Sequence, residues 1–190
     1  LTDEVHYYDG GRWAKFADGG GSSLELRDPS ADNRQPEAWS ASDESGNSIW
    51  QQYSYRGIAV ADTTPIQWNE FVMGLLNDGE ALFDDISVVR DPDGAAISLL
   101  QNGNFEGDVV GAPPEKWRIV GNHDQSGVAV DPLNAGNQVL PLISTGPTKH
   151  THNHAETTFV DNQLAPNGEE YEISFRARWL AGEPSIHSRL

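Results

Sequence analysis

Three histidines recur at every second position in the stretch TKHTHNHAET (148–157). In a β-strand, residues two apart face the same side, so His150, His152 and His154 would form one row that Glu156 continues. Neutral imidazoles and carboxylates are ligands for zinc, copper or nickel, so the pattern indicates a transition-metal site. A solvent-facing polar row is the alternative interpretation, and the spacing alone does not separate the two.

The geometry of a strand limits how many of these histidines can share one ion. His150 and His154 would lie roughly 13 Å apart on an extended strand, too far for two ligands of one metal. We therefore expect at most two of the three to bind together, with His152 in the pair and a further ligand from another strand. His187 in SIHSRL is the first candidate for that ligand, and His123 in VGNHDQS is the second.

The charge of the chain favours cations as partners. The 190 residues include 29 acidic and 12 basic side chains, for a net charge of −17. Such a surface repels phosphate backbones and anionic membranes, which argues against binding to nucleic acid or membranes. Calcium takes carboxylate oxygens and is therefore the favoured cofactor, although the same charge could serve solubility alone.

Missing sequence features narrow the function further. The sequence has no cysteine, which excludes disulfides, thiolate metal sites and thiol nucleophiles. It has no apolar run of the roughly 20 residues that a membrane-inserted helix needs. Neither a serine-nucleophile motif nor a phosphate-binding glycine loop occurs, so the sequence assigns no catalytic residues. Enzyme activity could come only from the histidines.

The elements that must position these residues have the period of strands. Apolar and polar residues alternate, or β-branched and aromatic residues gather, in the segments 22–28, 49–60, 81–89, 138–145, 156–160 and 171–180. Turns rich in Gly, Asn and Asp separate them. Only residues 67–76 would fit a helix, and they fit a strand nearly as well. We therefore predict an all-β protein of the β-sandwich or jelly-roll class.

Motifs in the middle of the chain resemble a known family. NGNFEGD (102–108), followed by PEKW (114–117), resembles the opening of jelly-roll carbohydrate-binding modules, the galactose-binding-like sandwiches attached to bacterial glycosidases. ALFDDISVV (81–89) resembles their last strand, and YEISFRARWL (171–180) resembles a strand from the middle of the module. The resemblance implies an all-β sandwich that binds carbohydrate.

The same resemblance implies a structural calcium ion. In such modules calcium joins the opening glutamate to the closing aspartate pair. Here the opening motif supplies Glu106 and backbone oxygens around Asn104, and the closing motif supplies Asp84 or Asp85. The two motifs belong to different segments of this sequence, which argues against one shared site.

The order of the motifs divides the chain. Because the closing motif precedes the opening motif, we expect a first β-sandwich-like segment over residues 1–98 and a second jelly-roll-like segment over 99–190, truncated at its C-terminus. Residues 9–45 resemble the C-terminal part of bacterial lamin-tail domains, which occur in large secreted proteins. Neither unit has every motif of a jelly roll, so either the chain is a fragment or its halves share one sandwich.

Aromatic residues in polar surroundings are the candidates for sugar binding. A Trp or Tyr ring buries the flat C–H face of a sugar with little loss of rotamer freedom. Trp39, Tyr53 and Tyr55 stand among polar neighbours and meet this description. Together with the resemblance, they favour a non-catalytic extracellular module that binds a polysaccharide, glycan or cell-surface polymer. Such a module would hold a cation and have neighbouring domains in a longer parent chain.

Two alternatives to this function stay open. One is a histidine-ligated metalloenzyme, copper-dependent and oxidative on polysaccharide, built on the histidines named above. The other is a structural or adhesion spacer that binds no small ligand.

Overall fold

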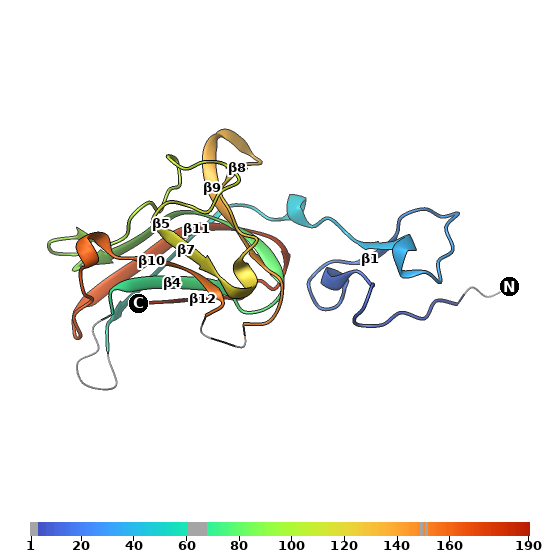
Figure 1. Cartoon of the computed structure of the whole chain (residues 1–190), viewed down its shortest axis with the longest axis horizontal. Coiled ribbons are helices and arrows are strands. Elements are labelled where there is room, and N and C mark those ends of the chain that lie inside the picture. Colours follow the sequence, from blue (N-terminus) through green and yellow to red (C-terminus); the bar gives the residue numbers. More distant parts are fainter. Residues whose placement is uncertain (1–3, 61–67, 149, 151) are drawn as a thin grey trace.

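The computed structural model describes residues 4–60, 68–148, 150 and 152–190, and it is all-β. A six-stranded and a four-stranded antiparallel sheet pack on one core, and a small two-stranded sheet stands apart from them (Figure 1). The helices of the described part are 3-10 turns of three residues each, so the predicted all-β sandwich is confirmed. Among the described residues, no helix has the length and apolar character needed to cross a bilayer.

The six-stranded sheet has the order β3-β11-β5-β9-β8, and β6 pairs with β5 beside this path. The strands are β3 (Gln51–Ile58), β5 (Gly79–Arg90), β6 (Ile97–Ser98), β8 (Ala129–Asp131), β9 (Asn134–Ser144) and β11 (Glu170–Gly182). β11 lies between β3 and β5, so a late strand is inserted between two early ones.

The four-stranded sheet has the order β12-β4-β10-β7. Its strands are β4 (Glu70–Leu75), β7 (Trp117–Val120), β10 (His154–Thr158) and β12 (Ile186–Arg189). Phe71, Met73 and Leu75 of β4 all point into the core, which is the alternation expected of a strand. The helical alternative for residues 67–76 is therefore wrong, and position 67 lies outside the described residues.

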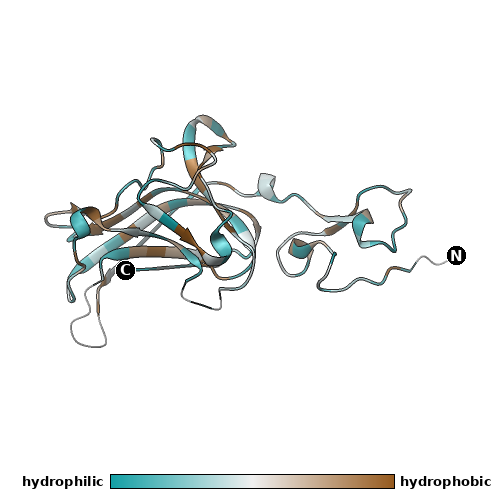
Figure 2. Ribbon diagram, viewed as in Figure 1, coloured by the Kyte–Doolittle hydropathy of each residue, from teal (hydrophilic) through white to brown (hydrophobic). Residues whose placement is uncertain are grey.

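The core between the sheets uses residues from both halves of the sequence. Phe71 and Phe83 pack in the same cluster as Trp117, Leu140 and Phe175. Burying each such side chain stabilises the fold by about 1.5–3 kcal/mol. Apolar residues recur along the strands of the sandwich (Figure 2). Both expected segments, 1–98 and 99–190, thus contribute strands to both sheets, as expected if the two halves share one sandwich.

An N-terminal extension, residues 4–50, projects from one end of the sandwich (Figure 1). It contains η1 (Lys15–Ala17), β1 (Leu24–Leu26), η2 (Pro36–Ala38), β2 (Trp39–Ala41) and η3 (Ser45–Asn47), with β1 antiparallel to β2. The Nζ atom of Lys15 lies 2.7 Å from a carboxylate oxygen of Asp78 and ties the extension to the sandwich. The remaining 3-10 turns are η4 (Gly121–His123) and η5 (Val160–Asn162).

Candidate functional site

The inner face of the six-stranded sheet is left partly uncovered at its edge strand, β3. Tyr53 and Tyr55 pair with Phe175 and Ile173 of β11, whose side chains are buried on the inner face. Directly opposite residues in an antiparallel pair share a face, so both tyrosines point toward the core side. They nevertheless stay 46% and 70% exposed, because β12, the edge of the other sheet, does not cover them.

Two hollows lie along this open edge, and together we call them the edge groove. The first has a volume of about 270 Å³ and is lined by Tyr55, Trp68 and Tyr171, with residues 188–190 across from them. The second has a volume of about 400 Å³ and is lined by Tyr53, Trp179 and Ile186, among others. Both hollows use residues of β3 and β12, so the edge groove follows the strands.

Tyr55 and Trp68 provide flat aromatic surface in the first hollow. Their side chains are 70% and 53% exposed. The ring of Tyr55 lies close to Gly57, where an added Cβ would come within 3.0 Å of the ring, so the absence of a side chain there makes room for it. Asn167 and Ser188 add polar groups to the same hollow. The sequence analysis selected Tyr55 as a sugar-binding candidate but not Trp68. The polar residue Asn69, which follows Trp68, could have indicated that this side chain is exposed.

The third aromatic candidate, Trp39, lies elsewhere. It opens β2 in the N-terminal extension, is partly buried, and donates a hydrogen bond of 2.8 Å from its indole nitrogen to the backbone oxygen of Asn33. The structure therefore brings Tyr53 and Tyr55 together on one strand and separates Trp39 from them.

The histidine-rich stretch is not one strand. β10 begins at His154, whereas His150 lies in a bend and His152 in a turn, and both are exposed. Asn153 shapes this loop: its backbone N–H donates to the oxygen of His150 at 3.3 Å, and its side-chain oxygen accepts from the backbone N–H of Asn122 at 3.0 Å. The predicted row of three histidines on one strand face is therefore wrong. Positions 149 and 151 lie outside the described residues.

A different set of three histidines meets at one end of the four-stranded sheet. His154 comes from β10, His187 from β12 and His123 from η4. Gly74 of β4 pairs with His187, and a Cβ at Gly74 would lie 2.6 Å from the Nε2 atom of His187. His123 is fully buried, and its Nε2 atom accepts a hydrogen bond of 3.0 Å from the backbone N–H of Leu75. His187 and His123 thus gather near His154 rather than His152.

Three histidines form this cluster (His123, His154 and His187), and burial and proximity favour the neutral forms of His123 and His187. Burial lowers the pKa of His123 to about 4, and the neighbouring His187 and His154 add to the effect. Burial also lowers the pKa of His187, with contributions from Arg189 and His154. The Nδ1 atoms of His123 and His154 and the Nε2 atom of His187 are buried and have no hydrogen-bond partner among the residues that the structure describes. Within the described part of the chain, no three His, Asp or Glu side chains are arranged to hold a metal, so zinc or copper binding stays a prediction.

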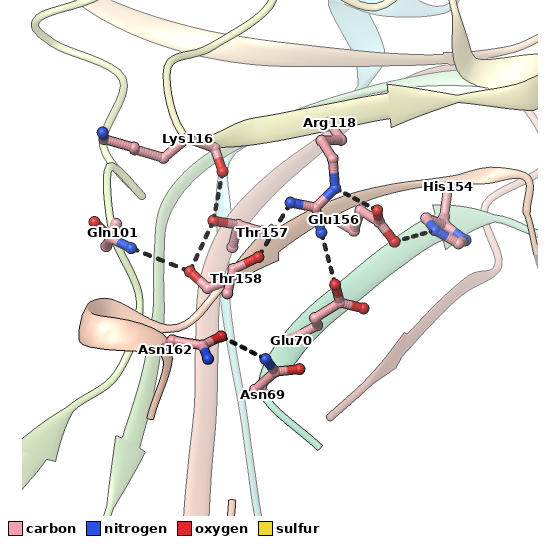
Figure 3. A network of polar contacts seen from close by, with 10 residues as sticks. All are labelled: Asn69, Glu70, Gln101, Lys116, Arg118, His154, Glu156, Thr157, Thr158 and Asn162. Carbon is pink, nitrogen blue, oxygen red and sulfur yellow. Dashed lines mark hydrogen bonds and ion pairs between the residues drawn. The ribbon is translucent and has the colours of Figure 1, made fainter. Parts of the chain in front are cut away.

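Beside the cluster, Arg118 of β7 links two carboxylates of the four-stranded sheet (Figure 3). Its guanidinium lies 2.5 Å from one oxygen of Glu156 and 2.8 Å from one oxygen of Glu70. The other oxygen of Glu156 lies 2.7 Å from the Nε2 atom of His154. Burial works against the charged form of Glu156, but the hydrogen bonds from Arg118 and His154 outweigh it and leave the pKa below its ordinary value.

The two motifs of the implied calcium site come to adjacent positions of β9. The backbone N–H of Gln138 donates to a carboxylate oxygen of Glu106 at 3.1 Å. The side-chain amide of Asn137 donates to a carboxylate oxygen of Asp84 at 3.0 Å. Glu106 of the opening motif and Asp84 of the aspartate pair, far apart in the sequence, therefore both contact the dipeptide Asn137-Gln138.

One feature of these residues suits a hard cation such as calcium, namely an unpartnered oxygen atom beside a carboxylate. Asp84 is buried, which raises its pKa, and its carboxylate also contacts Arg176 at 3.4 Å, whereas Asp85 is exposed. The side-chain oxygen of Gln138 is buried and has no hydrogen-bond partner in the described part of the chain. Glu106 and Gln138 contact each other, whereas the carboxylate of Asp85 lies 3.4 Å from Arg176. No three acidic or histidine side chains of the described residues are arranged to hold an ion, so calcium at Glu106 with Asp84 or Asp85 stays a prediction.

A scan against protein-family models and searches of curated proteins and of solved structures each returned no match. The resemblance to carbohydrate-binding modules therefore stays an expectation, and the functional argument rests on the geometry of the edge groove.

Proposed function

We propose that the chain is a non-catalytic extracellular β-sandwich module that binds a polysaccharide in the edge groove. The observation that carries the proposal is the pair of exposed aromatic side chains, Tyr55 and Trp68, in one hollow together with the polar residues Asn167 and Ser188. Aromatic rings bury the C–H faces of sugars, and a few placed polar groups satisfy their hydroxyls. This combination suits a sugar better than a purely apolar ligand.

The shape of the groove favours a chain over a single sugar. The hollow around Tyr53 continues the line of the hollow around Tyr55 along the same strand. A polymer lying along β3 would contact both tyrosines, which project from the same face of that strand. We therefore expect affinity to rise with the length of an oligosaccharide until both hollows are filled.

The test compares Tyr55→Ala with Tyr8→Ala. Tyr55 and Tyr8 are both 70% exposed, but only Tyr55 lines the edge groove. A ring stacked on a sugar contributes about 0.5–1.5 kcal/mol, so Tyr55→Ala should weaken binding about two- to tenfold and Tyr8→Ala should not. Binding is measured by affinity electrophoresis against a panel of polysaccharides and by calorimetry on those that retard the protein. Equal losses in both variants, or no retardation by any polymer, would contradict the proposal.

The two alternatives predict different results in the same experiments. A spacer would bind none of the polysaccharides, and its thermal stability would not respond to them. A histidine-ligated metalloenzyme would contain stoichiometric zinc or copper, which elemental analysis of protein purified without histidine-tag resin would detect.

A further inference from the structure

We infer that two copies of this chain pair through the free edge of β3 and join their six-stranded sheets into one continuous sheet. β3 bonds to β11 on one side, and no described residue pairs with its other side. Every residue of the strand except Gly57 is exposed. The inference concerns the backbone edge of β3 and does not rest on glycan binding.

This edge is longer and less protected than the edges formed by β7, β8 and β12. Those strands have three or four residues each, against eight in β3. Proteins usually protect an open edge with lysine, proline or a β-bulge. β3 has none of these, and its register with β11 is unbroken. Its one charged residue, Arg56, lies 2.5 Å from Glu172 and 2.9 Å from Asp93, so that charge is already compensated.

The hydrogen bonds at the end of β3 show which backbone groups face outward. Ala59, the residue after the strand, donates its N–H to the backbone oxygen of Glu169, just before β11. Backbone N–H and C=O groups of successive residues alternate between the two sides of a strand. The odd-numbered residues of β3 therefore bond to β11, whereas Gln52, Ser54 and Arg56 present their N–H and C=O groups at the free edge.

An antiparallel second copy of β3 matches these groups. With a twofold axis at Ser54, that residue faces itself and Gln52 faces Arg56, so each exchanges both of its backbone hydrogen bonds with the other copy. No two like charges meet, because Gln52 is neutral. Tyr53 of each copy then lies opposite Tyr55 of the other, at positions where aromatic pairs stabilise a sheet.

The tyrosines favour this register over its neighbours. An axis at Tyr55 would place Tyr53 opposite Gly57, and an axis at Tyr53 would place Tyr55 opposite Gln51. Only the axis at Ser54 pairs all four tyrosines of the dimer. The N-terminal extension leaves β3 at its Gln51 end and projects beyond the sandwich, so it does not run along the free edge (Figure 1).

The first test measures association by sedimentation from micromolar to near-millimolar protein. The wild type should dimerise, and more strongly in added salt, because each copy has a net charge of −17 that salt screens. Ser54→Lys places two lysines opposite each other at the axis and should weaken the dimer about tenfold or more. Ser98→Lys is the matched control, because Ser98 is an exposed serine of β6, which pairs with β5.

The second test reads the register. The chain has no cysteine, so a single introduced thiol can crosslink only to its copy. Facing residues at the axis lie about 5.5 Å apart between Cα atoms, which suits a disulfide, so Ser54→Cys should crosslink with glutathione disulfide as the oxidant. Gln52→Cys should not, because its counterpart lies four positions along the strand, about 14 Å away.

Crosslinking confined to Ser54→Cys, together with a dimer that Ser54→Lys weakens and Ser98→Lys does not, would support the inference. A wild-type chain that stays monomeric at every concentration and salt would overturn it. So would equal crosslinking of the two cysteine variants, or a dimer that Ser54→Lys leaves unchanged. All of these measurements use protein without glycan, so their failure would leave the proposed function standing.

Discussion

At the scale of single residues, His123 is a basic group that the fold buries in its neutral form. It accepts a hydrogen bond from the backbone of Leu75, and it faces His154 and His187. Glu156 is hydrogen-bonded to His154, and Arg189 lies close enough to His187 to lower its pKa. The histidine cluster therefore has a negative charge on one side and a positive charge on the other. Protonating the Nε2 atom of His123 would also break its hydrogen bond to Leu75.

The stability of the protein should therefore fall in mild acid. The pKa of His123 lies at about 4 in the fold against about 6.5 in an unfolded chain, so the unfolded state binds the proton more readily. The contribution is complete above pH 6.5 and is lost as the pH falls toward 4, where the cost reaches about 3 kcal/mol. His187 acts in the same direction. Urea unfolding at pH 7 and at steps down to pH 4 measures the effect.

His123→Gln tests the assignment of this pH dependence. A glutamine oxygen can still accept from the Leu75 backbone but does not titrate, so the variant should lose less stability between pH 6.5 and 4 than the wild type. His150→Gln is the control, because His150 is exposed in the loop before β10. A wild-type slope retained in His123→Gln would refute the assignment.

Residue types were more predictable from the sequence than their contacts. Alternation with the polar residues Gln52 and Ser54 singled out Tyr53 and Tyr55 in the sequence, although those polar residues lie on the opposite face of the strand. The tyrosines are exposed because β12 does not cover their face, which no local pattern indicates. The meeting of His123, His154 and His187 was only partly foreseeable. It depends on Gly74, whose missing side chain makes room for His187, and no spacing rule relates position 74 to position 187.

At the scale of elements, the opening loop 102–106 is packed tightly against β5. The backbone N–H of Ile86 donates to the oxygen of Gly103 at 2.9 Å, and a Cβ added at Gly103 would lie 1.9 Å from the backbone oxygen of Ile86. Phe105 then enters the core, with its ring centroid 5.9 Å from that of Trp117. The loop thus places Phe105 in the core, and its close approach to β5 requires glycine at position 103.

Gly103→Ala should destabilise the protein by about 1–3 kcal/mol, the usual cost of forcing extra volume into a packed position. The matched control is Gly107→Ala, four residues on, where an added Cβ would meet nothing within 4 Å. The free energy of unfolding from urea titration distinguishes the two. Similar values for both variants would show that the loop can shift away from β5 without cost.

Strands were predictable where alternation was strong, as in β5, β9 and β11. The histidine-rich stretch failed because alternation of histidine with threonine and asparagine has no apolar face, so nothing in it demands burial. Hydrogen bonds to Leu75, the last residue of β4, and to Leu76 hold the start of the loop instead: Thr148 donates its hydroxyl to the backbone oxygen of Leu75 and its backbone N–H to that of Leu76. Such long-range bonds are invisible in a local pattern.

At the scale of the whole molecule, the charge of −17 should make stability respond to calcium. A calcium ion held by Glu106 with Asp84 or Asp85, as the resemblance implies, would stabilise the fold by about 2.7 kcal/mol at a hundred times its dissociation constant. For a domain of this size, that is a rise in melting midpoint of about 5–10 °C. Scanning calorimetry in chelator and in millimolar calcium measures it.

Asp85→Asn is the control for the calcium response. Asp85 has a φ of 49°, a conformation that asparagine tolerates well, so the variant should keep its calcium-free midpoint and lose most of the calcium-dependent rise. An unchanged wild-type midpoint in calcium would mean that the carboxylates serve only solubility.

The insertion of β11 between β3 and β5 also determines when the protein can fold. Residues 51–58 find their partners only at residues 170–177, so loops must close over most of the chain before the six-stranded sheet exists. High contact order of this kind slows folding. During synthesis, β3 and β5 would wait on the order of ten seconds for β11 to emerge, with the tyrosines of β3 and the core side of β5 unpaired throughout. Unpaired strand edges and exposed apolar surface favour aggregation, so we expect the growing chain to be most prone to aggregate during that interval.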